Sequence, residues 1–273
     1  MITSPNRTIS IDGNSIHYEV YGTNENKPNM ILIHGFLSST FSFRRLVPLL
    51  KEHFNVIAVD LPPFGMSGKE KRFIYSFQNL ANVVVELLRI HEIKRATLVG
   101  HSMGGQIALY IAKYRPDLVD RIVLLASSGY SKRVKQSLIY ATYLPFFNRY
   151  IKYWLAKKGV MQNLLNVVSD HSLIDDEMVD GYGKPFDDEK YFVGLTKFVR
   201  DREGDLPAEE LKKIDTPCLL IWGEEDRVVP IHIGKRLNKD LPNSSFVSLP
   251  NTGHLIPEEK PEIIFNYIKK FTR

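Results

Sequence analysis

Residues 96–114 read ATLVGHSMGGQIALYIAKY. The stretch opens on a short apolar run, Ala96–Val99, passes through a turn of the pattern G-x-S-x-G around Ser102, and ends with helical spacing. A run that is apolar throughout is typical of a strand buried on both faces. The glycines around Ser102 permit a sharp turn that exposes the serine hydroxyl. The stretch predicts a strand–turn–helix unit that presents a nucleophile, and the structural alternative is a serine that merely caps the helix.

Similar apolar runs recur along the chain, separated by segments with helical spacing such as Leu80–Leu88. This alternation predicts right-handed crossovers and a doubly wound, mostly parallel α/β sheet. Residues 8–22 instead alternate apolar and polar residues around an Asp12-Gly13 turn, which predicts an N-terminal antiparallel hairpin. The expected parallel strands are Met30–Ile33, Val56–Val59, Ala96–Val99, Ile122–Leu125, Cys218–Trp222 and Phe246–Leu249.

The alternation stops between about residues 129 and 213, where the sequence is rich in aromatic residues and helical in pattern. We therefore predict an α/β core formed by residues 1–128 and 214–273, with a helical cap, residues 129–213, inserted in it. In open α/β sheets the site lies outside the carboxyl ends of the strands. Reactive residues are thus expected directly after the apolar runs.

Composition narrows the class of protein. The chain has 273 residues, of which 44% are hydrophobic and 25% charged, so a sizeable core is expected. Its net charge of +5 is mild, and most of the chain shows no clustering of basic residues with aromatics, so nucleic-acid binding is not indicated; residues 131–158 are the exception. The single cysteine, Cys218, excludes an intrachain disulfide and a cysteine-based zinc site, and its strand-like setting predicts a small buried hydrophobe.

Targeting signals are not visible in the sequence. Residues 1–7 lack a charged region followed by an apolar one, so no signal peptide is expected. No apolar run approaches the roughly 20 residues that a membrane span needs. We predict a cytoplasmic protein without stable membrane insertion.

Five motifs follow one another along the chain: His34-Gly35-Phe36, Asp60–Ser67, Gly100–Gly105, Gly223–Asp226 and Gly253-His254. In their order and spacing they resemble the α/β-hydrolase superfamily, in its cap-bearing branch of esterases, acyl hydrolases and carbon–carbon bond hydrolases. The resemblance covers nearly the whole chain and implies a serine hydrolase. Relatives that act on epoxides or haloalkanes carry an aspartate where Ser102 stands, so these activities are not expected. Triad chemistry needs no cofactor or metal, and we predict none.

A serine hydroxyl is a poor nucleophile unless a base takes its proton. Of the eight histidines, His254 lies in a polar, glycine-containing loop after the last expected strand, where packing does not explain it. The resemblance also implies a base at this position. Four other histidines have surface-like surroundings and are expected to be solvated: His17, His53, His91 and His232.

The acid that orients the base follows the nucleophile and precedes the histidine in this fold. Asp226 stands just past the strand Cys218–Trp222, and the resemblance favours it, with Glu225 as the alternative. The resemblance further implies an oxyanion hole formed by the backbone N–H groups of Phe36 and Met103.

Residues 131–158 contain seven basic residues, no acidic residue, and many aromatics. One interpretation is a pair of amphipathic cap helices with the basic face in water and the aromatic face over the active site. The other is a segment that touches an anionic membrane surface while the enzyme acquires a lipid-like ester. The aromatics are Tyr140, Tyr143, Phe146, Phe147, Tyr150, Tyr153 and Trp154.

The function predicted from these residues is a carboxylesterase-like serine hydrolase (EC 3.1.1). It would cleave a largely apolar carboxylic ester, short- to medium-chain or aromatic, through an acyl-enzyme formed on Ser102. Two alternatives use the same residues: hydrolysis of a carbon–carbon bond in a β-diketone or dienoate, and slow turnover by a ligand receptor or signalling protein. No nucleic-acid partner is expected.

Overall fold

The structure is a computed structural model that describes residues 5–273, apart from the side chain of residue 158. Residues 1–4 lie outside the described residues. They belong to the stretch in which no signal peptide is predicted and to the predicted core segment 1–128.

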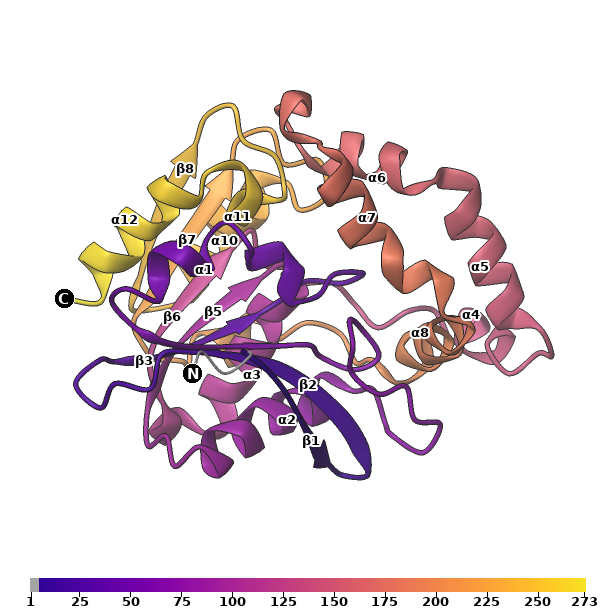
Figure 1. The fold of residues 1–273 in the computed structure, drawn as a ribbon, viewed down its shortest axis with the longest axis horizontal. Coiled ribbons are helices and arrows are strands. Elements are labelled where there is room, and N and C mark those ends of the chain that lie inside the picture. Colours follow the sequence, from indigo (N-terminus) through magenta and orange to yellow (C-terminus); the bar gives the residue numbers. More distant parts are fainter. Residues whose placement is uncertain (1–4) are drawn as a thin grey trace.

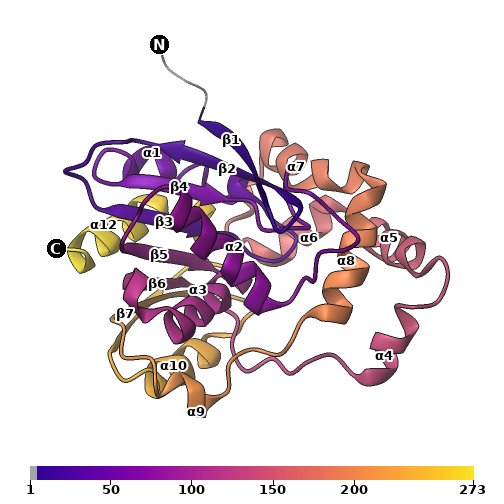
Figure 2. The ribbon, with the colours of Figure 1, turned by 90° about the horizontal axis from the view of Figure 1, so that it is seen from below.

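Eight strands form one sheet in the order β1-β2-β4-β3-β5-β6-β7-β8 (Figures 1 and 2). The hairpin β1–β2 is antiparallel and turns at Asp12 and Gly13, both with positive φ. Strand β2 runs antiparallel to β4, and all the remaining pairs are parallel, as predicted. The strands are β1 Asn6–Ile11, β2 Asn14–Tyr21, β3 Asn29–Ile33, β4 Asn55–Val59, β5 Ala96–His101, β6 Val119–Leu125, β7 Cys218–Gly223 and β8 Ser244–Leu249.

Helices cover both faces of the sheet, so the central strands are buried throughout. The helices α1 and α12 lie on one face, and α2 and α3 lie on the other (Figure 1). Cys218 is buried in β7, as expected, and burial raises the pKa of its thiol to about 12. The core helices are α1 Val47–Leu50, α2 Phe77–Ile90, α3 Met103–Tyr114, α9 Ala208–Leu211, α10 Ile231–Asp240, α11 Ile256–Glu259 and α12 Pro261–Phe271, with 3₁₀ turns η1 Thr40–Phe43 and η2 Pro116–Leu118.

Between β6 and β7 the chain forms helices and loops and contains no strand. Helices α4 to α8 lie beyond the carboxyl ends of the parallel strands, to one side of the core (Figures 1 and 2). We call α4 to α8 the cap; the limits at residues 128/129 and 213/214 remain a prediction. Its elements are α4 Gln136–Ala141, α5 Phe147–Lys158, α6 Val160–Val167, η3 His171–Leu173, α7 Asp176–Gly183, η4 Lys184–Asp187 and α8 Glu189–Asp201.

A buried glutamine fastens the two connections between core and cap. The side-chain amide of Gln106, on α3, donates to the carbonyl of Ser128 at 2.6 Å, and its oxygen accepts from the N–H of Leu206 at 3.1 Å. The two connections also bond to each other, since the N–H of Asp205 donates to the Ser131 carbonyl at 2.7 Å. Among the residues described, no helix is long and apolar enough to cross a membrane.

The expectation that His17 is solvated is wrong. Its ring is buried, and Nδ1 lies 2.9 Å from the carboxylate of Asp60. Asp60 also accepts from the backbone N–H groups of Thr40 and Met66, at 2.7 and 2.8 Å. Burial alone would raise the pKa of the Asp60 carboxyl, but these donors outweigh it and lower the pKa. His17 looks exposed in sequence because it belongs to an edge hairpin, and the loop after β4 covers it.

The contact between His17 and Asp60 predicts that the free energy of unfolding depends on pH. The hydrogen bond to Asp60 raises the pKa of His17 in the folded protein. The stabilisation is therefore complete below the unfolded pKa of about 6.5 and is lost as the pH rises through the folded pKa. The variant His17→Asn keeps a neutral donor but cannot become charged. We expect it to lower the free energy of unfolding by about 1–3 kcal/mol at pH 6 and by less at pH 9.

Urea unfolding of both proteins at the two pH values measures this difference. The matched control is His232→Asn, at an exposed position. An equal loss of stability at pH 6 and pH 9 would contradict the charged pair.

Candidate active site

The nucleophile candidate lies in a strained turn. Ser102 joins β5 to α3 with φ 52° and ψ −116°, a conformation that residues other than glycine rarely adopt. Its N–H donates to the Leu125 carbonyl at 2.9 Å, and its carbonyl accepts from Gly105 and Ser128 at 3.0 Å each. The Ser102 side chain makes no capping hydrogen bond to α3, so the alternative interpretation as a helix cap is wrong.

Packing explains why position 104, in this turn, is a glycine. A Cβ atom there would lie 2.7 Å from the carbonyl oxygen of His34 and closer still to that of Ile33. Only a residue without a side chain lets α3 begin this close to the end of β3. The sequence pattern thus places the start of α3, and with it the N–H of Met103, next to the loop that follows β3.

The predicted base and acid are in contact. Nδ1 of His254 lies 2.8 Å from Oδ2 of Asp226, and both side chains are buried. The other oxygen of Asp226 accepts from the N–H groups of Val228 and Val229, at 2.8 Å each. Because a carboxylate can only accept, the proton of the His254–Asp226 bond sits on Nδ1 and leaves Nε2 as an acceptor.

The neighbouring carboxylates are used elsewhere. Glu225 is exposed and accepts from the N–H of Thr252 at 2.7 Å, and Glu224 accepts from the hydroxyl of Ser248 at 2.8 Å. Asp226, and not Glu225, therefore contacts the imidazole.

The loop that carries His254 is tied to the cap by a residue that sequence reasoning missed. Buried Glu259, on α11, accepts from the N–H of Gly253 at 2.9 Å and from the N–H of Ser169, just past α6, at 2.8 Å. The N–H of His254 itself donates to the carbonyl of Val167 at 2.7 Å. The base is thus positioned from the core and the cap together.

The oxyanion candidates lie beside Ser102. A Cβ at Gly35 would be 3.1 Å from the Cβ of Ser102, so the loop that carries Phe36 packs against the nucleophile. His34 holds this loop from within: Nδ1 donates to the Gly35 carbonyl at 2.7 Å, and Nε2 accepts from the N–H of Leu61 at 2.9 Å. Met103 begins α3, where backbone N–H groups have no acceptor within the helix. The roles of Phe36 and Met103 stay a prediction.

His101 is a second residue that sequence reasoning missed, although it adjoins Ser102. Its Nε2 lies 2.8 Å from the carbonyl of His254, to which it donates, and the two rings are 4.9 Å apart. Burial, and then the neighbouring His254, lower the pKa of His101 to about 3. His101 is therefore neutral above about pH 4 and is suited to positioning His254 rather than to exchanging protons.

Ser102 and His254 line the same cavity, of about 230 Å³, between the core and the cap. The core contributes the loops after four parallel strands, and the cap contributes α6, α7 and η4. The lining is mostly apolar and includes no lysine, arginine or carboxylate side chain. Its residues are Gly35, Phe36, Leu37, Ser38, His101, Ser102, Val160, Asn163, Leu164, Val167, Tyr182, Phe186, Val228, His254 and Leu255.

Three polar atoms of this lining are buried and make no hydrogen bond of good geometry. They are Oγ of Ser38, the hydroxyl of Tyr182 and Nδ1 of His101. The hydroxyls of Ser38 and Tyr182 are close enough to interact with each other. Burial raises the pKa of Tyr182 well above its usual value, so this hydroxyl is a neutral donor. Unpaired buried polar atoms are rare and costly, and a bound polar group would satisfy them.

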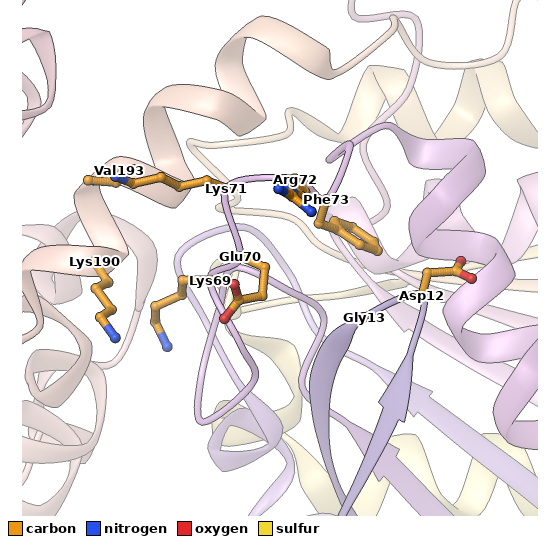
Figure 3. A pocket seen from close by; sticks show the side chains of 9 residues that line it. All are labelled: Asp12, Gly13, Lys69, Glu70, Lys71, Arg72, Phe73, Lys190 and Val193. Carbon is orange, nitrogen blue, oxygen red and sulfur yellow. The ribbon is translucent and has the colours of Figure 1, made fainter.

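A larger cavity, of about 600 Å³, lies between the β1–β2 turn, the loop 69–73 and α8 (Figure 3). Figure 3 shows Lys69 and Lys190 side by side in it. Lys69 is already engaged, since its ammonium donates to the Ser67 carbonyl at 2.8 Å and lies 3.6 Å from the carboxylate of Asp188. The residues that line this cavity include no serine, cysteine or histidine, so it offers no hydroxyl or thiol nucleophile with an imidazole base.

The expectation that the cap aromatics cover the active site is wrong. None of the seven aromatic residues between positions 131 and 158 that were expected over the active site lines the catalytic cavity. Most of them are exposed, and residues of α6, α7 and η4 take the place over Ser102. Helical periodicity shows that a segment has two faces but does not show which face meets the core.

The fold and the site define an α/β hydrolase with a helical cap. The profile of the alpha/beta hydrolase family matches residues 30–266, and the chain belongs to this family of hydrolases.

Among its relatives is the uncharacterized hydrolase YugF of Bacillus subtilis, 55% identical over 270 residues that cover 99% of this chain and 98% of YugF. The chain is also similar to a 2-hydroxy-6-oxo-6-(2'-aminophenyl)hexa-2,4-dienoic acid hydrolase of Metapseudomonas resinovorans, with 26% identity over 89% of this chain and 83% of the relative. Among solved structures, a membrane phospholipase A, a bacterial virulence factor, superposes with a TM-score of 0.81 and 26% identity over 98% of this chain and 85% of that one.

Loss of the His101 donor is expected to reduce turnover more than it weakens binding. In His101→Ala the carbonyl of His254 loses its partner, so we expect kcat to fall about tenfold, with a smaller rise in KM because the His101 ring also lines the cavity. The acid limb of the pH–rate profile should keep its midpoint, because His101 is neutral over the working range. Steady-state kinetics on a chromogenic ester from pH 5 to 9 measures both quantities.

The variant His101→Gln, which retains an N–H donor, should recover part of kcat, and His232→Ala serves as the exposed histidine control. An unchanged kcat in His101→Ala would refute the positioning role.

Proposed function

We propose that the protein is a serine hydrolase that cleaves carboxylic esters with Ser102, His254 and Asp226 as its catalytic triad. The observation that carries the proposal is the 2.8 Å contact between His254 and Asp226 at the cavity that Ser102 also lines. The bond to Asp226 keeps the proton on Nδ1 and so makes Nε2 the acceptor that a serine hydroxyl requires.

The reaction follows from these positions. Nε2 of His254 takes the proton of Ser102 as Oγ attacks the ester carbonyl carbon, and the carbonyl oxygen becomes an anion between the N–H groups of Phe36 and Met103. When the C–O bond breaks, the protonated His254 gives its proton to the leaving alkoxide. Water then attacks the acyl-enzyme with the same base and releases the acid and Ser102.

The cavity supports an apolar substrate of modest size. Its volume of about 230 Å³ is below the range typical of drug-sized ligands, which favours a short- to medium-chain or small aromatic acyl group. The similarity to a membrane phospholipase A supports ester cleavage and a lipid-like substrate.

Replacement of the nucleophile tests the proposal. Ser102→Ala should lower kcat for a chromogenic ester by a factor on the order of 10⁴ or more, because the proposed mechanism then has no nucleophile. It should also abolish covalent labelling by a fluorophosphonate probe, detected by intact-protein mass spectrometry. Ser128→Ala is the control, a serine whose backbone N–H bonds to the Ser102 carbonyl.

Substantial residual turnover in Ser102→Ala would refute this triad. Labelling of the wild-type protein combined with less than about one turnover per minute, against the usual 1–10³ s⁻¹, would instead support the slow-turnover receptor alternative.

Carbon–carbon bond hydrolysis is the second candidate, favoured by the similarity to the dienoic acid hydrolase. The lining of the cavity argues against it. A dienoic acid carries a carboxylate, which requires a cation or several strong donors when it is buried, and no lysine or arginine lines the cavity. A neutral ester fits the hydroxyls of Ser38 and Tyr182 without this cost. A higher kcat/KM for a dienoate than for any ester of a chain-length series would reverse this preference.

Enlarging the catalytic cavity should change the preference for the length of the acyl chain. Leu164 is buried and lines the cavity, so Leu164→Ala should shift the optimum of a p-nitrophenyl ester series toward longer acyl chains. The matched control is Met178→Ala, in the same hydrophobic cluster but outside the cavity lining. Both should lose about 2–5 kcal/mol of stability, whereas only the first should change the optimum. An unchanged optimum in Leu164→Ala would place the acyl group elsewhere.

A further inference from the structure

Exposed apolar side chains gather on one part of the cap. Nine of the fifteen exposed large hydrophobic residues in the described part of the chain lie between residues 138 and 161. Singly scattered exposed apolar residues are normal, whereas a concentration of them often marks an interaction surface. We call these nine residues the α4–α5 patch: Leu138, Tyr140, Tyr143, Leu144, Phe146, Tyr150, Tyr153, Trp154 and Met161.

Helix α5 carries the centre of the patch as a stripe. Phe146, Tyr150, Tyr153 and Trp154 follow the spacing of one helix face. The opposite face of α5 packs on α8 and holds the buried Leu155. Both faces of α5 therefore carry apolar side chains, one buried and one exposed. The helix lies at the outer edge of the cap (Figure 1).

The patch is surrounded by positive charge. Residues 131–158 carry seven basic residues and no acidic one. Lys152 pairs with Glu189 of α8, but Arg149 and Lys157 are exposed on the same side of α5 as the aromatic stripe. Other acidic residues of the cap pair with the core instead: Asp175, for example, pairs with Arg44 and Arg45.

Exposed aromatic rings together with basic side chains indicate which kind of partner fits the patch. A second copy of the chain would bring two basic patches together, which is unfavourable. The core of a protein–protein interface is typically poor in lysine, whereas five of the seven basic residues here are lysines. Tyrosine and tryptophan with lysine and arginine are the residues that settle at the headgroup level of a membrane. We propose that the α4–α5 patch docks the protein on the surface of an anionic lipid bilayer.

The patch is joined directly to the catalytic cavity. Gly159, with φ 70°, connects α5 to α6, and α6 lines the cavity through Val160 and Leu164. A bilayer bound to α5 would lie next to the cap wall of the site. The docking goes beyond the proposed function and does not depend on it, because it involves no catalytic residue.

Tryptophan fluorescence measures the docking. The chain has two tryptophans; Trp154 is 49% exposed in the patch, and Trp222 is fully buried in β7. Vesicles of phosphatidylcholine with about one-third phosphatidylglycerol should shift the emission to the blue and protect it from a soluble quencher, at low salt. The affinity should be about tenfold or more lower for pure phosphatidylcholine, and it should fall as the salt rises to about 0.5 M. Sedimentation with the vesicles provides a second readout.

Two aromatic variants separate docking from folding. Phe146 is 69% exposed with φ 66°, a conformation that asparagine adopts more readily, so Phe146→Asn removes the ring without a backbone penalty. The double variant Tyr150→Ser/Tyr153→Ser removes two rings of the stripe. Both should bind anionic vesicles several-fold more weakly and should melt at nearly the wild-type temperature. The matched control is Ile74→Ser/Ile263→Ser, at exposed apolar positions outside the patch.

Two double variants that remove positive charges test the electrostatic part of the proposal. Arg149→Gln/Lys157→Gln should weaken binding and reduce its salt dependence, whereas Lys94→Gln/Lys212→Gln, exposed on the core, should leave both unchanged. The proposal is overturned if the protein fails to sediment with anionic vesicles at low salt, or if patch and control variants bind equally. It is also overturned if sedimentation equilibrium shows a dimer that does not bind vesicles and that the aromatic variants of the patch dissociate.

Discussion

The backbone at Ser102 is held in a left-handed conformation that costs about 1–3 kcal/mol, and the surrounding structure is arranged so that no alternative is available. Neighbouring strands supply the fixed points, since the Ser102 N–H bonds to Leu125 at the end of β6. On the other side the glycine at 104 lets α3 begin against the end of β3. The position of the hydroxyl is thus a property of three parallel strands rather than of one loop.

Buried carboxylates fix the loops around the Ser102 turn. Each carboxylate accepts hydrogen bonds from backbone N–H groups of the loops that it holds in place. A backbone N–H group in a strand bonds to the neighbouring strand, and in these loops the carboxylate takes that role. The arrangement explains how four loops keep one geometry at the edge of the sheet. The carboxylates and the residues whose N–H groups they accept are Asp60 with Thr40 and Met66, Asp226 with Val228 and Val229, and Glu259 with Gly253 and Ser169.

The sheet was predictable from local apolar runs. The meeting of Asp226 with His254 was predictable from chain order together with the resemblance to α/β hydrolases, which favoured Asp226 over Glu225. The burial of His17 was not, since it depends on which loop crosses the hairpin. His101 had a signal in its adjacency to Ser102, but its contact with the His254 carbonyl joins residues 153 positions apart. Glu259 had no signal: it lies in a helix whose acidic residues resemble any solvated first turn.

The cap shows why a periodic pattern leaves function open. Helices α5 and α6 are consecutive and both amphipathic, yet α6 turns apolar residues to the cavity while α5 turns aromatic residues outward. The difference lies in the connection at Gly159, whose positive φ redirects the chain between the two helices. A chain that keeps these rings at its surface, beside the exposed cations Arg149 and Lys157, retains apolar area for a partner that is itself apolar and anionic.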